Sequence, residues 1–200
     1  MILKKWFLKL VTLVILSQLY MISYSQESGE GILHLVNRNN DNFWNNYFSV
    51  TSATGQSLSY ALPTSLLAIG LIAKDGSLTG KSLVVASGML VSVVLTTGLK
   101  YTINAERHYK SCPLIVKKDV GGSPSFPSGH TSDAFALATG LSLQFPKWYV
   151  IVPSYLWAGS VGYGRMYQGV HCFHDVGVGA LIGIGSAFLS YKLNSWMRGK

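Results

Sequence analysis

The feature that most constrains this chain is a series of long apolar segments that follows a polar region ending near residue 56. The segments cover roughly 57–73, 82–99, 131–164 and 176–193. The third contains Pro146-Lys147-Trp148, a turn signal, so it divides into 131–145 and 149–164. Alanine, leucine and glycine dominate these segments and strand alternation is absent, which favours helix. The sequence therefore predicts an all-α protein, a helical bundle.

Segment length alone does not decide whether these helices cross a membrane. A span needs about 20 apolar residues, with roughly 17 as the lower limit, and the two halves of the third segment are shorter. The loop charges are more informative, because cytoplasmic turns of membrane proteins are rich in lysine and arginine. If the chain starts outside at residue 26, every short cytoplasmic turn is basic. The residues concerned are Lys74, Lys81, Lys147, Lys192, Arg198 and Lys200. We expect five or six membrane-spanning helices, with loops 100–130 and 164–175 outside.

The composition agrees with a membrane protein. Hydrophobic residues make up 48% of the chain and charged residues only 12%, against about 25% charged residues in soluble domains. Gly179, Gly183 and Ala187 recur at four-residue spacing, which lets helices approach closely in lipid. The net charge is +8, but the basic residues are scattered rather than clustered, so nucleic acid is not indicated as a partner.

The N-terminal part has two regions ahead of the helical core. Residues 1–25 combine early lysines, an apolar stretch and the small residues Ser23 and Ser25, the pattern of a secretory signal peptide. The alternative is an uncleaved first membrane anchor. Residues 26–56 are rich in asparagine and aromatic residues, and Leu33 with Val36 and Phe43 with Tyr47 indicate short amphipathic helices. This suits a periplasmic or interfacial amphipathic segment, or else an ordinary surface helix and loop. Residues 57–200 form the helical core.

Two groups of residues on the expected outer side could bind an anion. Lys100 and Arg107 are fixed cations with six residues between them; alternatively, they are interfacial residues that extend toward lipid head groups. Pro127-Ser128-Gly129-His130 stands at the start of the helix 131–145, where free backbone amides bind anions. Ser128 can donate a hydroxyl proton, and His130 can exchange a proton near neutral pH. The alternative is a capped helix start with a surface histidine.

A third group combines Arg165, His171 and Asp175, with five and then three residues between them. On a helix, His171 and Asp175 are four residues apart and share a face. Asp175 can accept the proton of one imidazole nitrogen, which leaves the other nitrogen with its lone pair. The alternative is a structural ion pair.

Together the three groups read K-x6-R, PSGH and R-x5-H-x3-D, in that order. In this pattern, over about residues 30–193, the chain resembles the type 2 phosphatidic acid phosphatase superfamily, which also includes bacterial acid phosphatases and vanadium haloperoxidases. Two positions depart from the family pattern. The first motif usually has proline where this chain has His108, and the third usually begins Ser-Arg where it has Gly164-Arg165. The missing serine removes a polar contact but not the nucleophile.

The resemblance implies a role for each matching residue. His171 would be the nucleophile that forms a phosphohistidine, Asp175 its orienting partner, and His130 the general acid and then the general base. The groups that bind the phosphate would be Lys100, Arg107, Arg165, Ser128 and the amide of Gly129. Three cations can neutralise the transferring phosphoryl group without a metal, so no metal or cofactor is expected.

The expected function is that of a phosphatase in the bacterial inner membrane with a periplasm-facing active site. Its substrate would be a phosphorylated lipid: phosphatidic acid, phosphatidylglycerol phosphate, a polyprenyl pyrophosphate or a lipid A phosphate. The alternatives are a soluble periplasmic acid phosphatase of broad specificity, a vanadium haloperoxidase, and a non-catalytic membrane protein that binds lipid phosphates. Cys112 and Cys172 fall beside the first and third motifs and are expected to form a disulfide at the rim of the site, or else to be two separate thiols.

Overall fold

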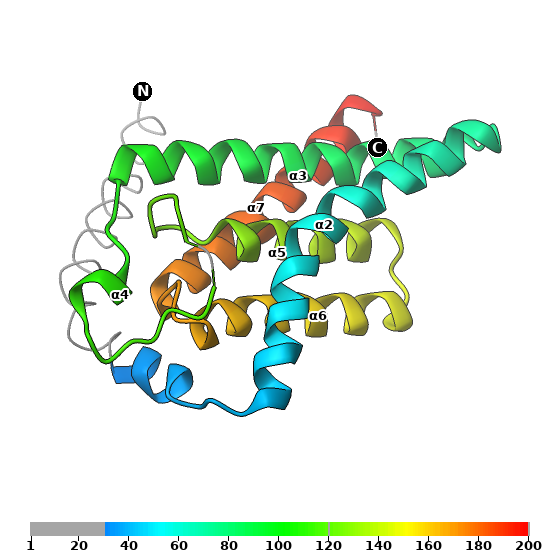
Figure 1. The fold of residues 1–200 in the computed structure, drawn as a ribbon. Helices are drawn as coiled ribbons and strands as arrows, with labels where there is room; N and C mark the ends of the chain where they lie inside the picture. The colour runs from blue at the N-terminus through cyan, green and yellow to red at the C-terminus, as the bar shows by residue number, and fades with distance from the viewer. Residues whose placement is uncertain (1–30, 120, 200) are drawn as a thin grey trace, which may run out of the picture.

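The computed structural model describes residues 31–119 and 121–199, and within these ranges all regular secondary structure is helical (Figure 1). The helices are α2 (Asn42–Ile72), α3 (Gly76–Ile103), α4 (His108–Ser111), α5 (Gly129–Gln144), α6 (Trp148–Tyr167) and α7 (Phe173–Met197). Residues 31–37 are also helical. The prediction of an all-α bundle is confirmed. The expected signal peptide or anchor at 1–25 lies outside the described residues.

Side-chain caps fix where the first two long helices begin. The Asp41 carboxylate accepts hydrogen bonds from the amides of Phe43 and Trp44, and Asp75 does the same for the start of α3. Aspartate is a favoured N-cap because it satisfies amides that have no partner in the first turn. The expected helix start at residue 57 is therefore wrong. α2 begins at Asn42 and passes through the expected boundary at residue 56 without a break.

α2 changes direction along its length. Its first half crosses α6 and α5, and its second half runs outward along α3 (Figure 1). Pro63 lies inside the helix, and proline bends a helix because it lacks an amide hydrogen and its ring displaces the preceding turn.

α5 is the central helix of the bundle and contacts α2, α3, α6 and α7. Its buried face consists of small residues, including Ala134, Ala136 and Ala138, so neighbouring helices come close. α7 approaches α5 at Gly179 and Gly183. An added Cβ at Gly183 would meet the backbone of α5, and one at Gly179 would meet the backbone of Ser128, the residue just before α5. Ala187 packs against Gly88 of α3 in the same way. The close approach expected from the Gly179, Gly183, Ala187 spacing is confirmed.

The interior of the bundle contains polar groups beside its apolar clusters, and much of its outer surface is apolar. Hydroxyl groups meet in the interior, where the Ser132 hydroxyl lies 2.5 Å from that of Ser92 and accepts a hydrogen bond of 2.8 Å from Thr96. Large apolar side chains face outward, among them Leu90, Val94, Leu156, Leu181 and Leu189. Extensive exposed apolar surface marks contact with a membrane or a partner, and interhelical hydroxyl pairs are typical of helices in lipid.

Among the described residues, the stretches Gly76–Lys110, which contains α3, and Phe173–Met197, which is α7, are long and apolar enough to cross a membrane. The predicted spans at 131–145 and 149–164 coincide with α5 and α6, which are helical as expected. The number of helices that span the bilayer stays a prediction.

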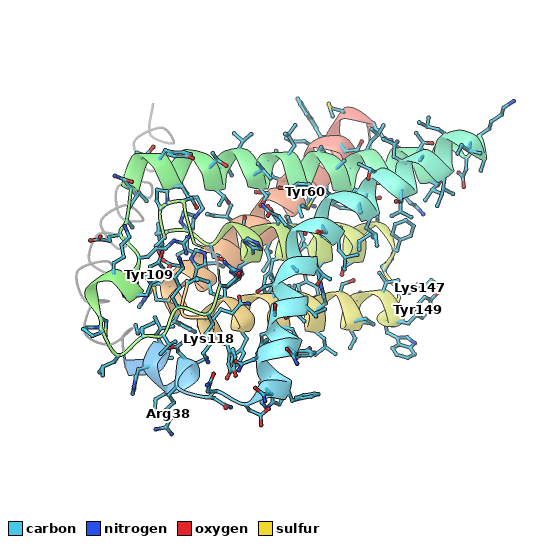
Figure 2. The ribbon with its side chains drawn as sticks, viewed as in Figure 1. Arg38, Tyr60, Tyr109, Lys118, Lys147 and Tyr149 are labelled. Atoms are coloured by element: carbon cyan, nitrogen blue, oxygen red, sulfur yellow. The ribbon has the colours of Figure 1, made fainter. Side chains whose placement is uncertain are left out.

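The two ends of the bundle differ in chemistry. The end of α3, the segments 104–119 (which contain α4) and 121–128, and the starts of α5 and α7 gather at one end (Figure 1). Lys147, in the turn between α5 and α6, and Tyr149, in the first turn of α6, lie at the opposite end (Figure 2). The three motifs therefore lie at one end of the bundle, and the basic turn expected on the cytoplasmic side lies at the other.

Candidate active site

The best-defined feature of the motif-bearing end is the pair formed by His171 and Asp175. His171 lies between α6 and α7, and Asp175 lies in the first turn of α7. Their side chains are only 2% and 3% exposed, and Nδ1 of His171 is 3.2 Å from Oδ2 of Asp175. Because a carboxylate accepts hydrogen bonds, this contact places the imidazole proton on Nδ1. The lone pair is then on Nε2, which is the arrangement that a nucleophile requires.

Two further donors hold the Asp175 carboxylate in place. The Ser125 hydroxyl donates to Oδ2 over 2.6 Å, and the Cys172 amide donates to the same oxygen over 3.1 Å. The Asp175 backbone carbonyl in turn accepts from the amide of Ser128 at 2.9 Å. The third motif is thereby joined to the second through hydrogen bonds.

Burial governs the protonation of the candidate nucleophile. It lowers the pKa of His171 to about 4, because a buried imidazolium is poorly solvated. The hydrogen bond and the negative charge of Asp175 act in the opposite direction, and burial outweighs them. His171 is therefore neutral near pH 7, as nucleophilic attack by its ring nitrogen demands.

The two cations of the first motif are held by backbone carbonyl groups. Lys100, in the last turn of α3, donates from Nζ to Pro124 over 2.7 Å and to Ser125 over 3.4 Å. Arg107, 5% exposed, donates to the carbonyls of Ser123 and Val170. Both cations thus bind the loop that leads into the second motif, and Arg107 also reaches the residue before His171.

Arg165 is the most deeply buried of the three cations, at 2% exposure. Its Nη1 donates to the Asp119 carboxylate over 2.6 Å and to Oε1 of Gln168 over 3.1 Å. Its Nε is buried and has no hydrogen-bond partner among the described residues. Since buried donors are nearly always paired, this Nε is available to an acceptor that enters the site.

The second motif forms the start of α5. Ser128 is the N-cap residue and is fully buried, and its hydroxyl lies 2.9 Å from that of Thr131. Gly129 stands beside Lys100, whose Cε would be 3.8 Å from a Cβ at this position. This short separation brings the helix start next to the first-motif lysine. Free amides at such a start are suited to a phosphate oxygen.

His130 is partly buried on the side of α5 that faces α2, where its ring lies near Gly55. The charges close enough to act on it are those of Arg165, Asp119 and Lys100, with His171 also nearby. All eight residues expected in the site therefore lie at the same end of the bundle. Their individual roles stay predictions.

One group of potential metal ligands occurs among the described residues. His108, Cys172 and Asp175 each place a ligand atom within 4.8 Å of the others. Burial raises the pKa of the Cys172 thiol to about 12, so the sulfur keeps its proton, whereas metals bind the thiolate. The Asp175 Oδ2 atom already accepts hydrogen bonds from His171, from the Ser125 hydroxyl and from the Cys172 amide. The chemistry of this group therefore does not fit a metal centre.

The predicted disulfide is wrong for this structure, in which Cys112 and Cys172 are both free thiols. They belong to a single apolar cluster with Leu33, Ile115 and Met166. Proximity at the rim was correctly anticipated, but the contact is apolar packing rather than a covalent bond.

Three site residues were not identified from the sequence: Ser125, Gln168 and Asp119. Ser125 lies in the turn-rich run just before the second motif, and Gln168 lies inside the third motif, three residues after Arg165. Asp119 is the only acidic residue in the lysine-containing loop 108–126. An isolated carboxylate among cations was a signal that could have drawn attention to it.

Comparison with known proteins identifies relatives of the whole chain. The PAP2 superfamily model matches residues 81–198. An undecaprenyl-diphosphatase from Sulfolobus acidocaldarius is 30% identical over 193 residues, which are 95% of this chain and 91% of that protein.

Two solved structures share the fold. Aquifex aeolicus LpxE has a TM-score of 0.70 and 29% identity, covering 82% of this chain and 94% of its own. A transmembrane PAP2-type phosphatidylglycerolphosphate phosphatase from Bacillus subtilis has a TM-score of 0.75 and 23% identity, covering 93% and 94%. With the family model spanning all three motifs and a relative aligned over nearly the full length, the chain belongs to the PAP2 superfamily.

Proposed function

We propose that this protein is a membrane phosphatase that hydrolyses the phosphate monoester or pyrophosphate group of a lipid through a phosphohistidine at His171. The observation that carries the proposal is the buried contact of 3.2 Å between His171 Nδ1 and Asp175 Oδ2. It leaves Nε2 with its lone pair, and the low pKa of the imidazole keeps that nitrogen unprotonated at neutral pH.

In the first step, Nε2 of His171 attacks phosphorus and the bond to the leaving oxygen breaks. His130 must carry a proton for this step and gives it to that oxygen; the negative charge of the bound phosphate favours the protonated imidazole. In the second step, neutral His130 takes a proton from water, and the resulting hydroxide attacks the phosphohistidine. Inorganic phosphate leaves, and both histidines return to their starting states. A covalent intermediate divides a difficult displacement into two easier ones.

The positive charge for these steps comes from the protein. Lys100, Arg107 and Arg165 would bind the oxygens of the transferring phosphoryl group, helped by Ser128 and the amide of Gly129. Phosphoryl transfer depends mainly on positioning and charge stabilisation, and donors fixed in advance are effective because they need no reorganisation. The unpaired Nε of Arg165 supports this role.

The outward apolar surface of α3, α6 and α7 supports a lipid substrate that is reached from the bilayer, over a soluble phosphatase of broad specificity. The four candidate lipids are those expected from the motifs. The undecaprenyl-diphosphatase aligned over 95% of this chain makes a polyprenyl pyrophosphate the first to test. The separation of the motifs from the basic turn at Lys147 (Figure 2) supports a periplasmic site in the bacterial inner membrane.

The test is a phosphate-release assay over all four lipid classes, with the full chain in detergent and no added metal. We expect the parent to release phosphate from at least one lipid and His171→Ala to release none. His34→Ala, which changes a histidine of the helical segment 31–37, is the control and should match the parent. Equal turnover by parent and His171→Ala would contradict the mechanism, and a parent inactive on every class would contradict the function. Release of the protein by osmotic shock without detergent would favour the soluble alternative.

A further inference from the structure

We infer that Asp119 is a displaceable counter-ion that occupies part of the phosphate site, so that a substrate must replace its carboxylate on Arg165. Asp119 would then be a specificity-determining residue, because it would set the charge that an incoming group needs. The inference rests on the proposed function, in which Arg165 binds the substrate phosphate.

The geometry of the ion pair shows which partner can move. Oδ2 of Asp119 lies 2.6 Å from Nη1 of Arg165, and the side chains are 32% and 3% exposed respectively. Arg165 is fixed among buried groups, including Gln168. Asp119 reaches it from the solvent side, so rotation of the aspartate side chain would open the guanidinium to another anion.

Arg165 differs from the other two cations in the kind of partner that it has. Lys100 and Arg107 donate to backbone carbonyls, which are neutral. Arg165 instead has an ionised partner, and Asp119 also lies close enough to act on His130. A fixed carboxylate here would repel an incoming phosphate, whereas a carboxylate that moves away would expose a full positive charge.

The residue before Asp119 is held by several contacts, which favours a motion of the Asp119 side chain over a motion of this part of the backbone. The Lys118 amide donates to the Gln168 carbonyl over 2.9 Å, and Lys118 Nζ donates to Asn37 over 2.9 Å. The same ammonium group lies 4.2 Å from the centroid of the Tyr167 ring. Lys118 thus joins three segments of the chain (its position is labelled in Figure 2), and Asp119 follows directly after it.

Charge then discriminates among phosphorylated groups. A carboxylate carries one negative charge, whereas a phosphate monoester near neutral pH carries roughly 1.5 to 2. A phosphate can also accept two parallel hydrogen bonds from one guanidinium, whereas the Asp119 carboxylate accepts from Nη1 of Arg165. A terminal phosphate should therefore displace Asp119 more readily than a singly charged phosphodiester does.

The experiment measures binding of inorganic phosphate to the full chain in detergent by isothermal titration calorimetry. We expect Asp119→Asn to bind phosphate more tightly, by about fivefold, the upper end for a solvent-accessible ion pair. Asp119→Glu keeps the charge and should bind like the parent. Glu106→Gln is the matched control, since it removes one carboxylate whose ion pair with Lys110 is exposed, and should leave the affinity unchanged.

Each other outcome overturns the inference in a distinct way. Weaker binding by Asp119→Asn would show that the carboxylate positions Arg165 instead of competing for it. Unchanged binding would show that the ion pair does not overlap the phosphate site, and equal tightening in Glu106→Gln would point to general charge. If the parent binds no phosphate and hydrolyses no lipid, the proposed function itself fails. A parent that hydrolyses lipid while Asp119→Asn shows no gain rejects only the role of Asp119.

Discussion

A single oxygen of Asp175 joins His171 to the rest of the site: Oδ2 lies 3.2 Å from the imidazole Nδ1 and 2.6 Å from the Ser125 hydroxyl. The carboxylate is thus fixed by a residue just before the second motif while it orients the candidate nucleophile of the third. His171 can point its second nitrogen in only one direction as long as both contacts persist.

Asp175→Asn should reduce kcat by about three to four orders of magnitude, because an amide no longer fixes the productive tautomer; the comparable change in a serine-protease triad costs about 10⁴. The measurement is phosphate release from the best lipid at saturating concentration. An Asn variant within tenfold of the parent would show that the orientation of His171 does not depend on this carboxylate.

Ser125→Ala should have a smaller effect, about tenfold on kcat, since it removes one of the hydrogen bonds that hold the carboxylate and leaves the carboxylate in place. Ser142→Ala is a matched control, because the Ser142 hydroxyl donates only to a carbonyl of its own helix, Ala138, away from the site. Equal activities of the two variants would contradict a positioning role for Ser125.

Gly183→Ala should destabilise the fold by about 1–3 kcal/mol, as overpacking of a tight interior does. An added methyl group would meet the Ser132 carbonyl and the Ala136 amide of α5, which are backbone atoms that cannot turn aside. Gly185→Ala, two residues along the same helix, meets nothing within 4 Å and should be neutral or stabilising by up to about 1 kcal/mol. Thermal unfolding of both variants in the same detergent tests this, and similar melting temperatures would contradict the close approach of α5 and α7.

The low pKa of His171 makes a prediction for stability against pH. Burial holds the folded-state pKa at about 4, below the unfolded value of about 6.5, so the unfolded chain binds more protons between these two values. The contribution of neutral His171 is fully present above about pH 6.5 and is lost progressively as the pH falls toward 4. His171→Gln should therefore flatten the dependence of the melting temperature on pH in this window. An unchanged slope would contradict a buried neutral imidazole.

Chelation of metals should leave activity unchanged to within about twofold. The three basic side chains supply the charge that a metal would otherwise provide, and the nearest group of potential ligands contains a protonated thiol and an engaged carboxylate. Phosphate release after dialysis against EDTA is the measurement. Loss of activity that returns with a specific divalent ion would contradict the proposed mechanism.

The sequence predicted the later helices well because apolar segments and turn residues mark them directly. The expected 131–145 is α5 at Gly129–Gln144, with the PSGH motif at its start. The length of α2 was not predicted: Phe43 and Tyr47 indicate a short amphipathic helix, but the asparagine-rich residues around them hide its continuity with the apolar segment 57–73. Their helix is set instead by the Asp41 cap and by packing of residues such as Phe48 against Tyr167 of α6.

The residues of the candidate site likewise fall into those that the sequence predicted and those that it did not. Residues at short spacings, such as His171 and Asp175, were found from the sequence, but the expected shared helix face is wrong: His171 lies before the start of α7 and contacts Asp175 across the N-cap residue Cys172. Asp119 meets Arg165 from 46 positions away, and Asn37 meets Val116 from 79 positions away. Such pairs depend on how loops fold over the helix ends, and no periodicity in one sequence encodes that path.

The most direct test of the central claim is to trap the phosphoryl group on the enzyme. The parent would be mixed rapidly with lipid carrying a labelled terminal phosphate, quenched under alkaline denaturing conditions that preserve phosphohistidine, and digested for mass spectrometry. We predict that the label is on His171, that it forms and decays at rates consistent with turnover, and that His171→Ala neither acquires it nor releases phosphate. Label on another residue, or sustained turnover by His171→Ala, would contradict the proposal.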